Sequence, residues 1–215
     1  MKSIGITGQN GFTGSYLCNT ISLLKDEFVL IPFDKEFFEN ENQLRNWVKQ
    51  CDVIVHLAAM NRHPDPQVIY DTNIGLVKKL VTALEKTGTN PQIIFSSSTQ
   101  EERDNLYGRS KKEGRDLLAA WAEKHGAKFA GLIVPNVFGP FGKPFYNSVV
   151  ATFCYQLCNN QEPRIDTDGL IKLIYVDELA KVIVNAIRSG SHNPEWKVTH
   201  TSEYYVSQIL LQLQE

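Results

Sequence analysis

The sequence has no long apolar run and almost no net charge. None of its segments reaches the roughly 18 consecutive apolar residues that a transmembrane helix needs. The formal net charge is -2, whereas a protein that binds nucleic acid over a broad surface carries a strongly basic face. Residues 1–4 lead straight into a strand-like segment and do not resemble a signal peptide. We therefore expect neither a membrane span nor a nucleic acid partner.

Cysteine is also scarce, and the chain has four: Cys18, Cys51, Cys154 and Cys158. Cys154 and Cys158 stand four residues apart in a helical pattern and so share a face, but no further ligands at the spacing of a zinc site are near. We therefore expect no metal, and reduced thiols that are buried as small apolar side chains. Reduced thiols are typical of the cytoplasm, where we expect the protein to act.

Apolar segments alternate with segments of helical period as far as residue 134. Strands are expected at residues 3–7, 28–33, 53–57, 92–97 and 129–134, and helices at residues 12–25, 41–50, 68–86 and 107–125. Such alternation is typical of a parallel sheet with helices on both faces. The pattern predicts an α/β fold with a Rossmann-type, doubly wound parallel sheet.

The pattern changes after Val134. Residues 135–144 are rich in Pro and Gly and are expected to form a loop, and helices are expected at residues 148–158, 176–187 and 202–213. Open α/β sheets bind ligands at the carboxyl ends of their strands. We therefore predict a dinucleotide-binding domain over residues 1–134 and a small C-terminal substrate-binding cap over residues 135–215 that is interleaved with the core.

Three glycines follow the first expected strand and open the first helix, at Gly8, Gly11 and Gly14. In this context the first permits a tight turn, the second lets the backbone approach a pyrophosphate, and the third lets the helix pack closely. The amino terminus of the helix attracts the anion. The motif predicts a site for the diphosphate of a nicotinamide cofactor, with Asn10 and Phe12 among its contacts.

Two strand ends are expected to complete the cofactor site. Asp34 follows the second strand, where a carboxylate binds the hydroxyls of the adenosine ribose and repels a 2′-phosphate. This favours NAD over NADP, although the neighbouring Lys35 could accept the phosphate, and a helix-capping role for Asp34 stays open. Leu57, Ala58 and Ala59 end the third strand, where small residues either let the backbone lie against the cofactor or merely pack.

A serine, a tyrosine and a lysine are the candidate catalytic residues. Tyr107 and Lys111 are four residues apart and so lie on one helix face. A nearby ammonium is expected to lower the pKa of Tyr107, which makes the phenol a proton donor or acceptor near neutral pH. Ser98, at the end of a strand, is expected to hold a substrate carbonyl toward Tyr107. Asn73 either supports Lys111 through water or satisfies backbone groups.

Longer segments point to a family. The chain resembles an extended short-chain dehydrogenase/reductase over essentially its whole length, and within that group the reductase domain of the bifunctional capsular-polysaccharide enzymes of the CapF type. The segments that carry the closer resemblance are HLAAMNR (56–62), SSSTQ (96–100), NLYGRSK (105–111), PNVFG (135–139) and YNSVVATFCY (146–155). Those enzymes make precursors of UDP-N-acetyl-L-fucosamine. The resemblance implies reduction of the C4 keto group of a UDP-4-keto-6-deoxy-N-acetylhexosamine with NAD or NADP.

The same resemblance implies that Asn136 and Asn147 contact the diphosphate region of the sugar nucleotide or shape its pocket, with loop capping as the alternative. Amide and cationic side chains suit a diphosphate and a hydroxylated ring. Pro135 is expected beside the cofactor. The residues expected at the substrate are Asn61, Arg62, Ser98, Asn136, Lys143 and Asn147.

The chain departs from the CapF type in two respects. Those enzymes carry a C-terminal cupin domain linked to C3 epimerisation, which these residues do not include, so a separate epimerase is an expected partner. Ile133 stands where they have an arginine, three residues before Asn136, which leaves the details of nucleotide binding and the choice between NAD and NADP open. A homodimer is expected by analogy.

Two other functions stay open beside the reductase. A 4-epimerase or a 4,6-dehydratase can be built on the same fold, but dehydratases carry an Asp-Glu pair directly after the active-site hydroxyl residue, where this chain has Thr99 and Gln100. Dehydration is therefore disfavoured, whereas epimerisation is not excluded. A non-catalytic dinucleotide sensor is disfavoured because such proteins usually lose the tyrosine or the lysine, and both are present.

Overall fold

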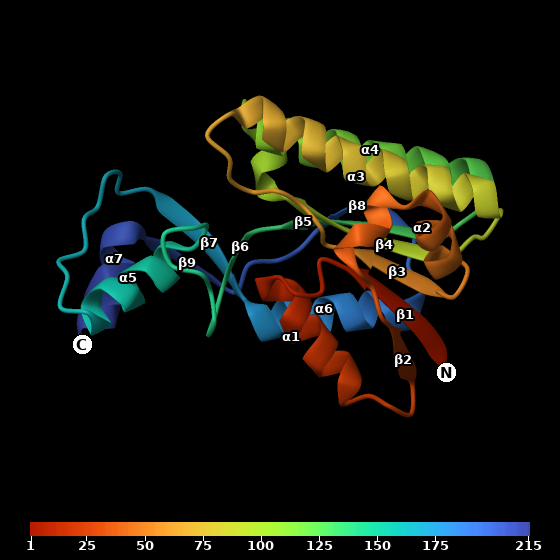
Figure 1. Cartoon of the computed structure of the whole chain (residues 1–215). Coiled ribbons are helices and arrows are strands. Elements are labelled where there is room, and N and C mark those ends of the chain that lie inside the picture. The colour runs from red at the N-terminus through yellow and green to blue at the C-terminus, as the bar shows by residue number, and fades with distance from the viewer.

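A six-stranded parallel sheet forms the body of the protein. The computed structural model describes all residues, 1–215. The strands follow the order β2-β1-β3-β4-β5-β8, and every neighbouring pair is parallel (Figure 1). Their bounds are Lys2–Thr7 (β1), Phe28–Ile31 (β2), Val53–His56 (β3), Gln92–Ser98 (β4), Phe129–Val134 (β5) and Asn193–Lys197 (β8).

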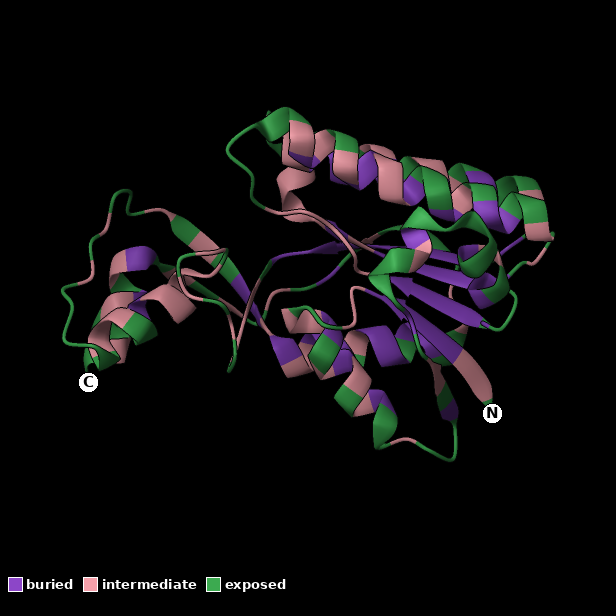
Figure 2. Ribbon diagram, viewed as in Figure 1, coloured by how far each residue is buried: buried purple, intermediate pink, exposed green.

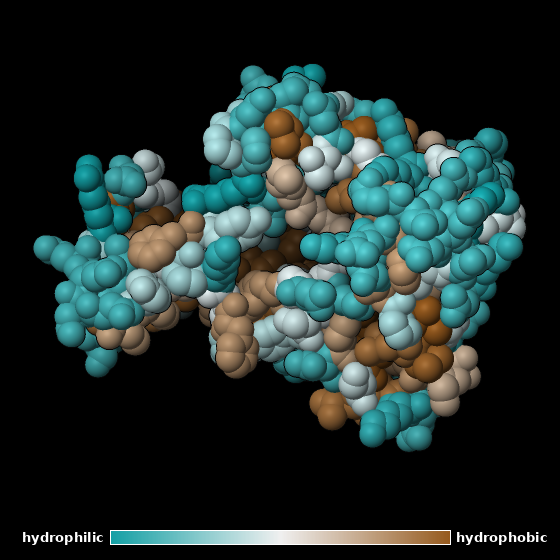
Figure 3. Space-filling view, viewed as in Figure 1, coloured by the Kyte–Doolittle hydropathy of each residue, from teal (hydrophilic) through white to brown (hydrophobic).

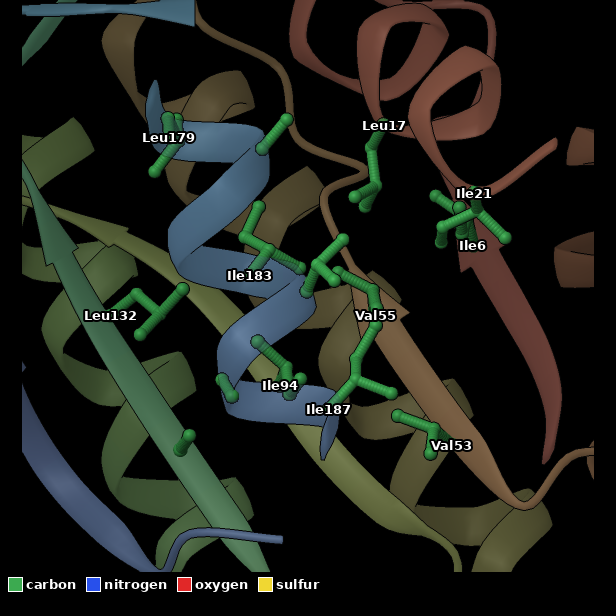
Figure 4. Close-up of a cluster of buried hydrophobic side chains, with 14 of the residues drawn as sticks. Ile6, Leu17, Ile21, Val53, Val55, Ile94, Leu132, Leu179, Ile183 and Ile187 are labelled. Carbon is green, nitrogen blue, oxygen red and sulfur yellow. The ribbon is translucent and has the colours of Figure 1, made fainter. Parts of the chain in front are cut away.

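Helices cover both faces of this sheet. One face is covered by α1 (Phe12–Ser22) and α6 (Val176–Ser189), the other by α2 (Glu41–Val48), α3 (Pro66–Thr87) and α4 (Leu106–His125). Figure 4 shows the first of the two cores, in which side chains of the strands meet those of α1 and α6. The α/β, doubly wound fold predicted from the sequence is confirmed.

The start of α4 fixes the place of the candidate catalytic residues. Asn105 precedes the helix, and its side-chain oxygen accepts a hydrogen bond from the N–H of Gly108 at 2.7 Å, which satisfies an unpaired amide of the first turn. The helix ends at Gly126, whose φ of 66° is readily adopted by glycine. Because α4 begins at Leu106, Tyr107 and Lys111 fall in its first two turns, near the carboxyl end of β4.

A smaller lobe stands beside the carboxyl ends of the strands, at the left of Figure 1. It contains a three-stranded sheet of order β6-β7-β9 and two helices. Its elements are β6 (Asn136–Phe138), α5 (Val149–Cys158), β7 (Leu170–Tyr175), β9 (Ser202–Tyr205) and α7 (Val206–Gln214). Its core has four buried residues, against 19 and 18 in the cores of the body, so most of the lobe is exposed or half-buried (Figure 2).

The second half of the chain differs from the sequence prediction in four places. The loop expected at 135–144 begins with β6, the helix expected at 202–213 is a strand as far as Tyr205, and β7 and β8 have no counterpart in the prediction. The sequence of β8, NPEWK, lacks the apolar pattern of a strand, and its backbone is extended because it pairs with β5 at the sheet edge. Since α6 and β8 complete the body, the division at residue 134 stays a prediction.

All four cysteines are free. Cys51 is buried and Cys18 half-buried, but Cys154 and Cys158 on α5 are exposed. The prediction that all are buried is therefore wrong for these two, because the small lobe lacks the core to cover both. No helix has the length together with the apolar character needed to cross a membrane.

Candidate active site

The glycine turn between β1 and α1 is packed tightly. Gly8 has a φ of 75°, and a Cβ there would lie 2.8 Å from the backbone nitrogen of Ala58. A Cβ on Gly14 would lie 2.2 Å from the carbonyl oxygen of Gly8. Gly11 precedes α1 without a side-chain cap, and the first turn of the helix holds no acidic residue, so its amides are free for an anion. The turn therefore fits the diphosphate of a dinucleotide.

The third strand end lies directly beside this turn. The N–H of Leu57 donates to the carbonyl of Thr7 at 3.1 Å, and the N–H of Ala58 donates to the Thr7 hydroxyl at 3.2 Å. Ala59 is half-buried next to them, as Phe12 is in the first turn of α1, while Asn10 is exposed. These residues occupy the rim expected for the cofactor, and their contacts with it stay predictions.

Asp34, which follows β2, already makes a hydrogen bond within the protein. Its side chain accepts a hydrogen bond from the N–H of Glu36 at 3.0 Å and so caps η1 (Lys35–Glu39). The capping role is thus present, and a carboxylate has further lone pairs for a ribose hydroxyl. Gln9 was not expected to take part: its side chain bonds both backbone groups of Phe33, donating to the carbonyl and accepting from the N–H at 3.4 Å. Gln9 therefore ties the glycine turn to the segment that presents Asp34.

Ser98 and Tyr107 lie side by side. The Ser98 hydroxyl accepts from the N–H of Gln100 at 3.2 Å and lies close enough to Tyr107 to act on the pKa of its phenol. Burial raises the pKa of Tyr107 to about 12, with Tyr146 adding to the rise and Ser98 opposing it. The prediction that Lys111 lowers this pKa is wrong for this structure, because desolvation of the phenol outweighs other effects. Tyr107 is therefore fully protonated at neutral pH, the form of a proton donor.

Lys111 is almost fully buried, at 4 % exposure. Its Nζ lies 4.6 Å from the centroid of the Phe95 ring, and burial lowers its pKa to about 8, against which the Glu101 carboxylate acts. His56 stacks on the same Phe95 ring, with 5.7 Å between the ring centroids. Burial lowers the pKa of His56 to about 3. The site thus holds one cationic group in an apolar and aromatic setting.

Asn73 supports the site through the backbone. Its side chain accepts from the N–H of Met60 at 2.7 Å, donates to the Met60 carbonyl at 3.1 Å and donates to the Ser110 hydroxyl at 3.0 Å. Of the two roles expected for this residue, the structure has the one in which it satisfies backbone groups. It holds the segment before Asn61 against the helix that carries Tyr107.

Figure 3 shows a hollow between the body and the small lobe. Asn136 and Asn147 line one cavity of about 170 Å³, and the Asn136 amide also donates to the carbonyl of Lys172 at 3.2 Å. Arg62 reaches across to the same loop, with Nη1 2.7 Å from the carbonyl oxygen of Phe145.

The loop that ends at Asn147 carries two further residues of interest. The Nζ of Lys143 lies 5.3 Å from the centroid of the Tyr146 ring. Tyr146, which adds to the rise in the pKa of Tyr107, was not expected, and only its place beside Asn147 could have indicated it. Asn61 is half-buried after β3, and Pro135 is buried directly after β5. The structure therefore brings the sugar-side residues to one region, and their roles stay predictions.

A larger cavity, of about 310 Å³, lies elsewhere. It is lined by residues around the amino end of β2, including Met1, Lys25 and Phe28. The glycine turn and Tyr107 are at the carboxyl ends of the strands, so this cavity is at the opposite end of the sheet. Its lining is mainly apolar, and none of the candidate catalytic or cofactor residues is part of it.

The chain is similar to proteins of known activity or structure. A UDP-2-acetamido-2,6-beta-L-arabino-hexul-4-ose reductase of Pseudomonas aeruginosa is 31% identical over 183 residues, which are 85% of this chain and 48% of that protein. The structure of the capsular polysaccharide assembling protein CapF from Staphylococcus aureus matches with a TM-score of 0.80 and 30% identity, over 98% of this chain and 56% of that one. The chain thus spans about half the length of these relatives.

More distant structures share the fold. UDP-glucose 4-epimerase from Thermotoga maritima, solved with UDP-glucose, matches with a TM-score of 0.84 at 21% identity, over 99% of this chain and 81% of that one. The resemblance to the reductase domain of CapF-type enzymes is confirmed by the closer matches. The profile of the NAD dependent epimerase/dehydratase family matches residues 4–199. The chain belongs to the NAD dependent epimerase/dehydratase family.

Proposed function

We propose that this protein reduces the C4 keto group of a UDP-4-keto-6-deoxy-N-acetylhexosamine with a nicotinamide cofactor, in the synthesis of sugar nucleotides for surface polysaccharide. The observation that carries the proposal is the half-buried, protonated Tyr107 beside Ser98, one helical turn from Lys111 and at the same sheet edge as the glycine turn. The reductase from Pseudomonas aeruginosa, 31% identical, supports this choice of reaction.

The cofactor site is built from the first half of the chain. The glycine turn and the free amides of α1 would hold the diphosphate, Asp34 the adenosine ribose, and Lys111 the ribose of the nicotinamide. When bound, the reduced cofactor supplies the hydride for the keto carbon. A carboxylate at Asp34 favours NADH over NADPH, while the exposed Lys35 beside it is the feature that opposes this preference.

Ser98 and Tyr107 act on the keto oxygen. Because the Ser98 oxygen accepts from the N–H of Gln100, the hydroxyl proton of Ser98 is free to be donated to the substrate. Tyr107 gives its proton to the oxygen as negative charge develops there. The phenolate that remains takes its proton back from solvent, while Lys111 is assigned to the ribose of the nicotinamide.

The sugar nucleotide is placed in the hollow between the body and the small lobe. Asn136 and Asn147 line a cavity on the small lobe, and Lys143 and Arg62 bring positive charge to the loop that ends at Asn147, which suits a diphosphate. A 4-epimerase is the alternative that these residues leave open, since the same groups can move a proton in either direction. A homodimer, a separate epimerase as partner and action in the cytoplasm stay predictions.

Product analysis with purified protein tests the proposal. NADH or NADPH is supplied with a panel of UDP-4-keto-6-deoxy-N-acetylhexosamines, and with UDP-N-acetylglucosamine for the alternative. A reductase consumes one reduced cofactor for each 4-hydroxy sugar formed. An epimerase interconverts UDP-sugars without net consumption. If no UDP-sugar is reduced while NAD(H) binds, the reductase proposal is wrong and a cofactor sensor is favoured.

A further inference from the structure

A buried ion pair lies directly beneath the candidate catalytic residues. The guanidinium of Arg115 donates three hydrogen bonds to the Glu101 carboxylate, two from Nε at 3.0 and 3.2 Å and one from Nη2 at 3.0 Å. The exposed fractions of the two side chains are 3% and 6%. The other ion pairs that join separate elements of the body are at the surface, where they contribute little.

This pair joins the two elements that carry the reacting groups. Glu101 belongs to η2 (Thr99–Glu102), which follows Ser98, and its carboxylate also accepts a hydrogen bond from the Ser97 hydroxyl. Arg115 lies on α4, and with Tyr107 and Lys111 it forms a series with a spacing of four residues along one helix face. Any shift of α4 along its axis would therefore break the contacts between Arg115 and Glu101.

The sheet edge holds the same guanidinium from the other side. Nη1 of Arg115 donates to the carbonyl of Pro194 on β8 at 3.0 Å, and Nη2 lies 3.1 Å from Glu195. Gly131 on β5 leaves room for the side chain, since a Cβ there would lie 2.7 Å from Cδ of Arg115. The arginine is thus fixed by η2, β5 and β8 together.

We propose that Glu101 and Arg115 form a positioning pair for the reaction centre, which holds Ser98 and the face of α4 with Tyr107 and Lys111 in one fixed arrangement. Only the expected change in kcat rests on the proposed reductase function. Neither residue touches the substrate in this arrangement, because both side chains are buried below the reacting groups. A tyrosine that must transfer a proton over hydrogen-bond distance is sensitive to small displacements, so loss of the pair should lower kcat.

Glu101 has a second effect, on the charge of Lys111. Lys111 is faced by Glu101 from η2, by His56 from β3 and by Tyr107 one turn earlier on α4. His56 and Tyr107 are uncharged at neutral pH, with pKa values of about 3 and about 12. The carboxylate of Glu101 therefore opposes the desolvation that lowers the pKa of Lys111 to about 8. Removing that carboxylate should move the lysine pKa further down.

The test uses a double variant so that no buried charge is left alone. Glu101→Gln/Arg115→Met removes both charges, a change that often leaves stability intact. The matched control is Glu102→Gln, since Glu102 is the next residue of η2 but is 72% exposed and paired only with Lys197. The double variant also removes the positive charge of Arg115, so the lysine titration uses Glu101→Gln alone. In protein with ¹³C-labelled lysine, assigned with Lys111→Arg, we expect the Lys111 pKa to fall in Glu101→Gln and to stay unchanged in the control.

With the UDP-4-keto sugar as substrate, we expect kcat of the double variant to fall about tenfold or more, with KM for the cofactor changed less than about twofold. Wild-type kcat in the folded double variant would overturn the proposal. If the wild-type protein reduces no sugar, the proposed function fails, and the lysine titration alone tests the role of the pair. An unchanged Lys111 pKa then overturns the positioning pair as well. Should the double variant not fold, Glu101→Asp keeps the charge and shortens the side chain, and a kcat equal to that of the wild type is then the overturning result.

Discussion

The ammonium group of Lys111 lies over the ring of Phe95, with Nζ 4.6 Å from the ring centroid. The aromatic face stabilises a cation that has lost most of its contact with water. This relationship places the one buried ammonium of the site between the sheet and the helix that carries Tyr107. The charge of that ammonium is the property on which the pH dependence of the protein rests.

We predict that kcat/KM falls as the pH rises through about 8. Burial lowers the pKa of Lys111 to about 8, so its charge is complete below that pH and lost above it. Tyr107, with a pKa of about 12, stays protonated throughout this range. The pH profile of the reductase reaction measures this. Lys111→Arg serves as control. Because an arginine stays charged, the pH profile of this variant should lack the fall in kcat/KM near pH 8. A limb that begins only above about pH 10 would contradict the assignment.

Tyr107→Phe should lower the rate on the order of a hundredfold or more, because the ring stays and the proton is lost. Binding of the nicotinamide cofactor should remain, because the substitution removes only the Tyr107 hydroxyl and leaves every other contact of the cofactor in place. Single-turnover kinetics and cofactor titration measure the two effects. Tyr70→Phe is the matched control, as the Tyr70 hydroxyl bonds Glu113 between α3 and α4, away from Ser98. Near wild-type turnover of Tyr107→Phe would show that another group supplies the proton.

Asp34→Ala should relax the cofactor preference toward NADPH, because the like-charge contact with a 2′-phosphate is removed. Asp34 also caps η1, so Asp34→Asn is the sharper variant: it keeps the cap to Glu36 and loses only the charge. The measurement is kcat/KM for NADH and NADPH in all three proteins. A wild-type protein that already prefers NADPH strongly would mean that Lys35 or another residue sets the preference.

The sequence predicted the sheet body well because its signals are local. The glycine turn, the apolar strands and the helical period of α4 each act within a few residues, and the structure has each close to the predicted place. The strand β8 could not be predicted, since NPEWK is extended only through pairing with β5.

The pair beneath the site was beyond prediction for a related reason. Arg115 and Glu101 are charged residues that a single sequence assigns to the surface. They are buried only because Gly131 and the strand β8, far along the chain, leave a channel between them. The raised pKa of Tyr107 also follows from burial: the sequence shows the lysine four residues away, but the desolvation of the phenol depends on the whole fold.

The last prediction concerns the sugar nucleotide. Asn147→Ala should raise KM for the UDP-4-keto sugar about two- to tenfold, the effect of one lost hydrogen bond, and leave KM for the cofactor nearly unchanged. Lys143→Ala should act in the same direction through the diphosphate, and more so at low ionic strength, because an exposed cation is screened by salt. Lys25→Ala is the matched control, since Lys25 is an exposed lysine at the far cavity by Met1 and Phe28. Calorimetry with UDP separates nucleotide binding from catalysis. Equal UDP affinity in the wild-type protein and both variants would place the nucleotide elsewhere than the hollow between the body and the small lobe.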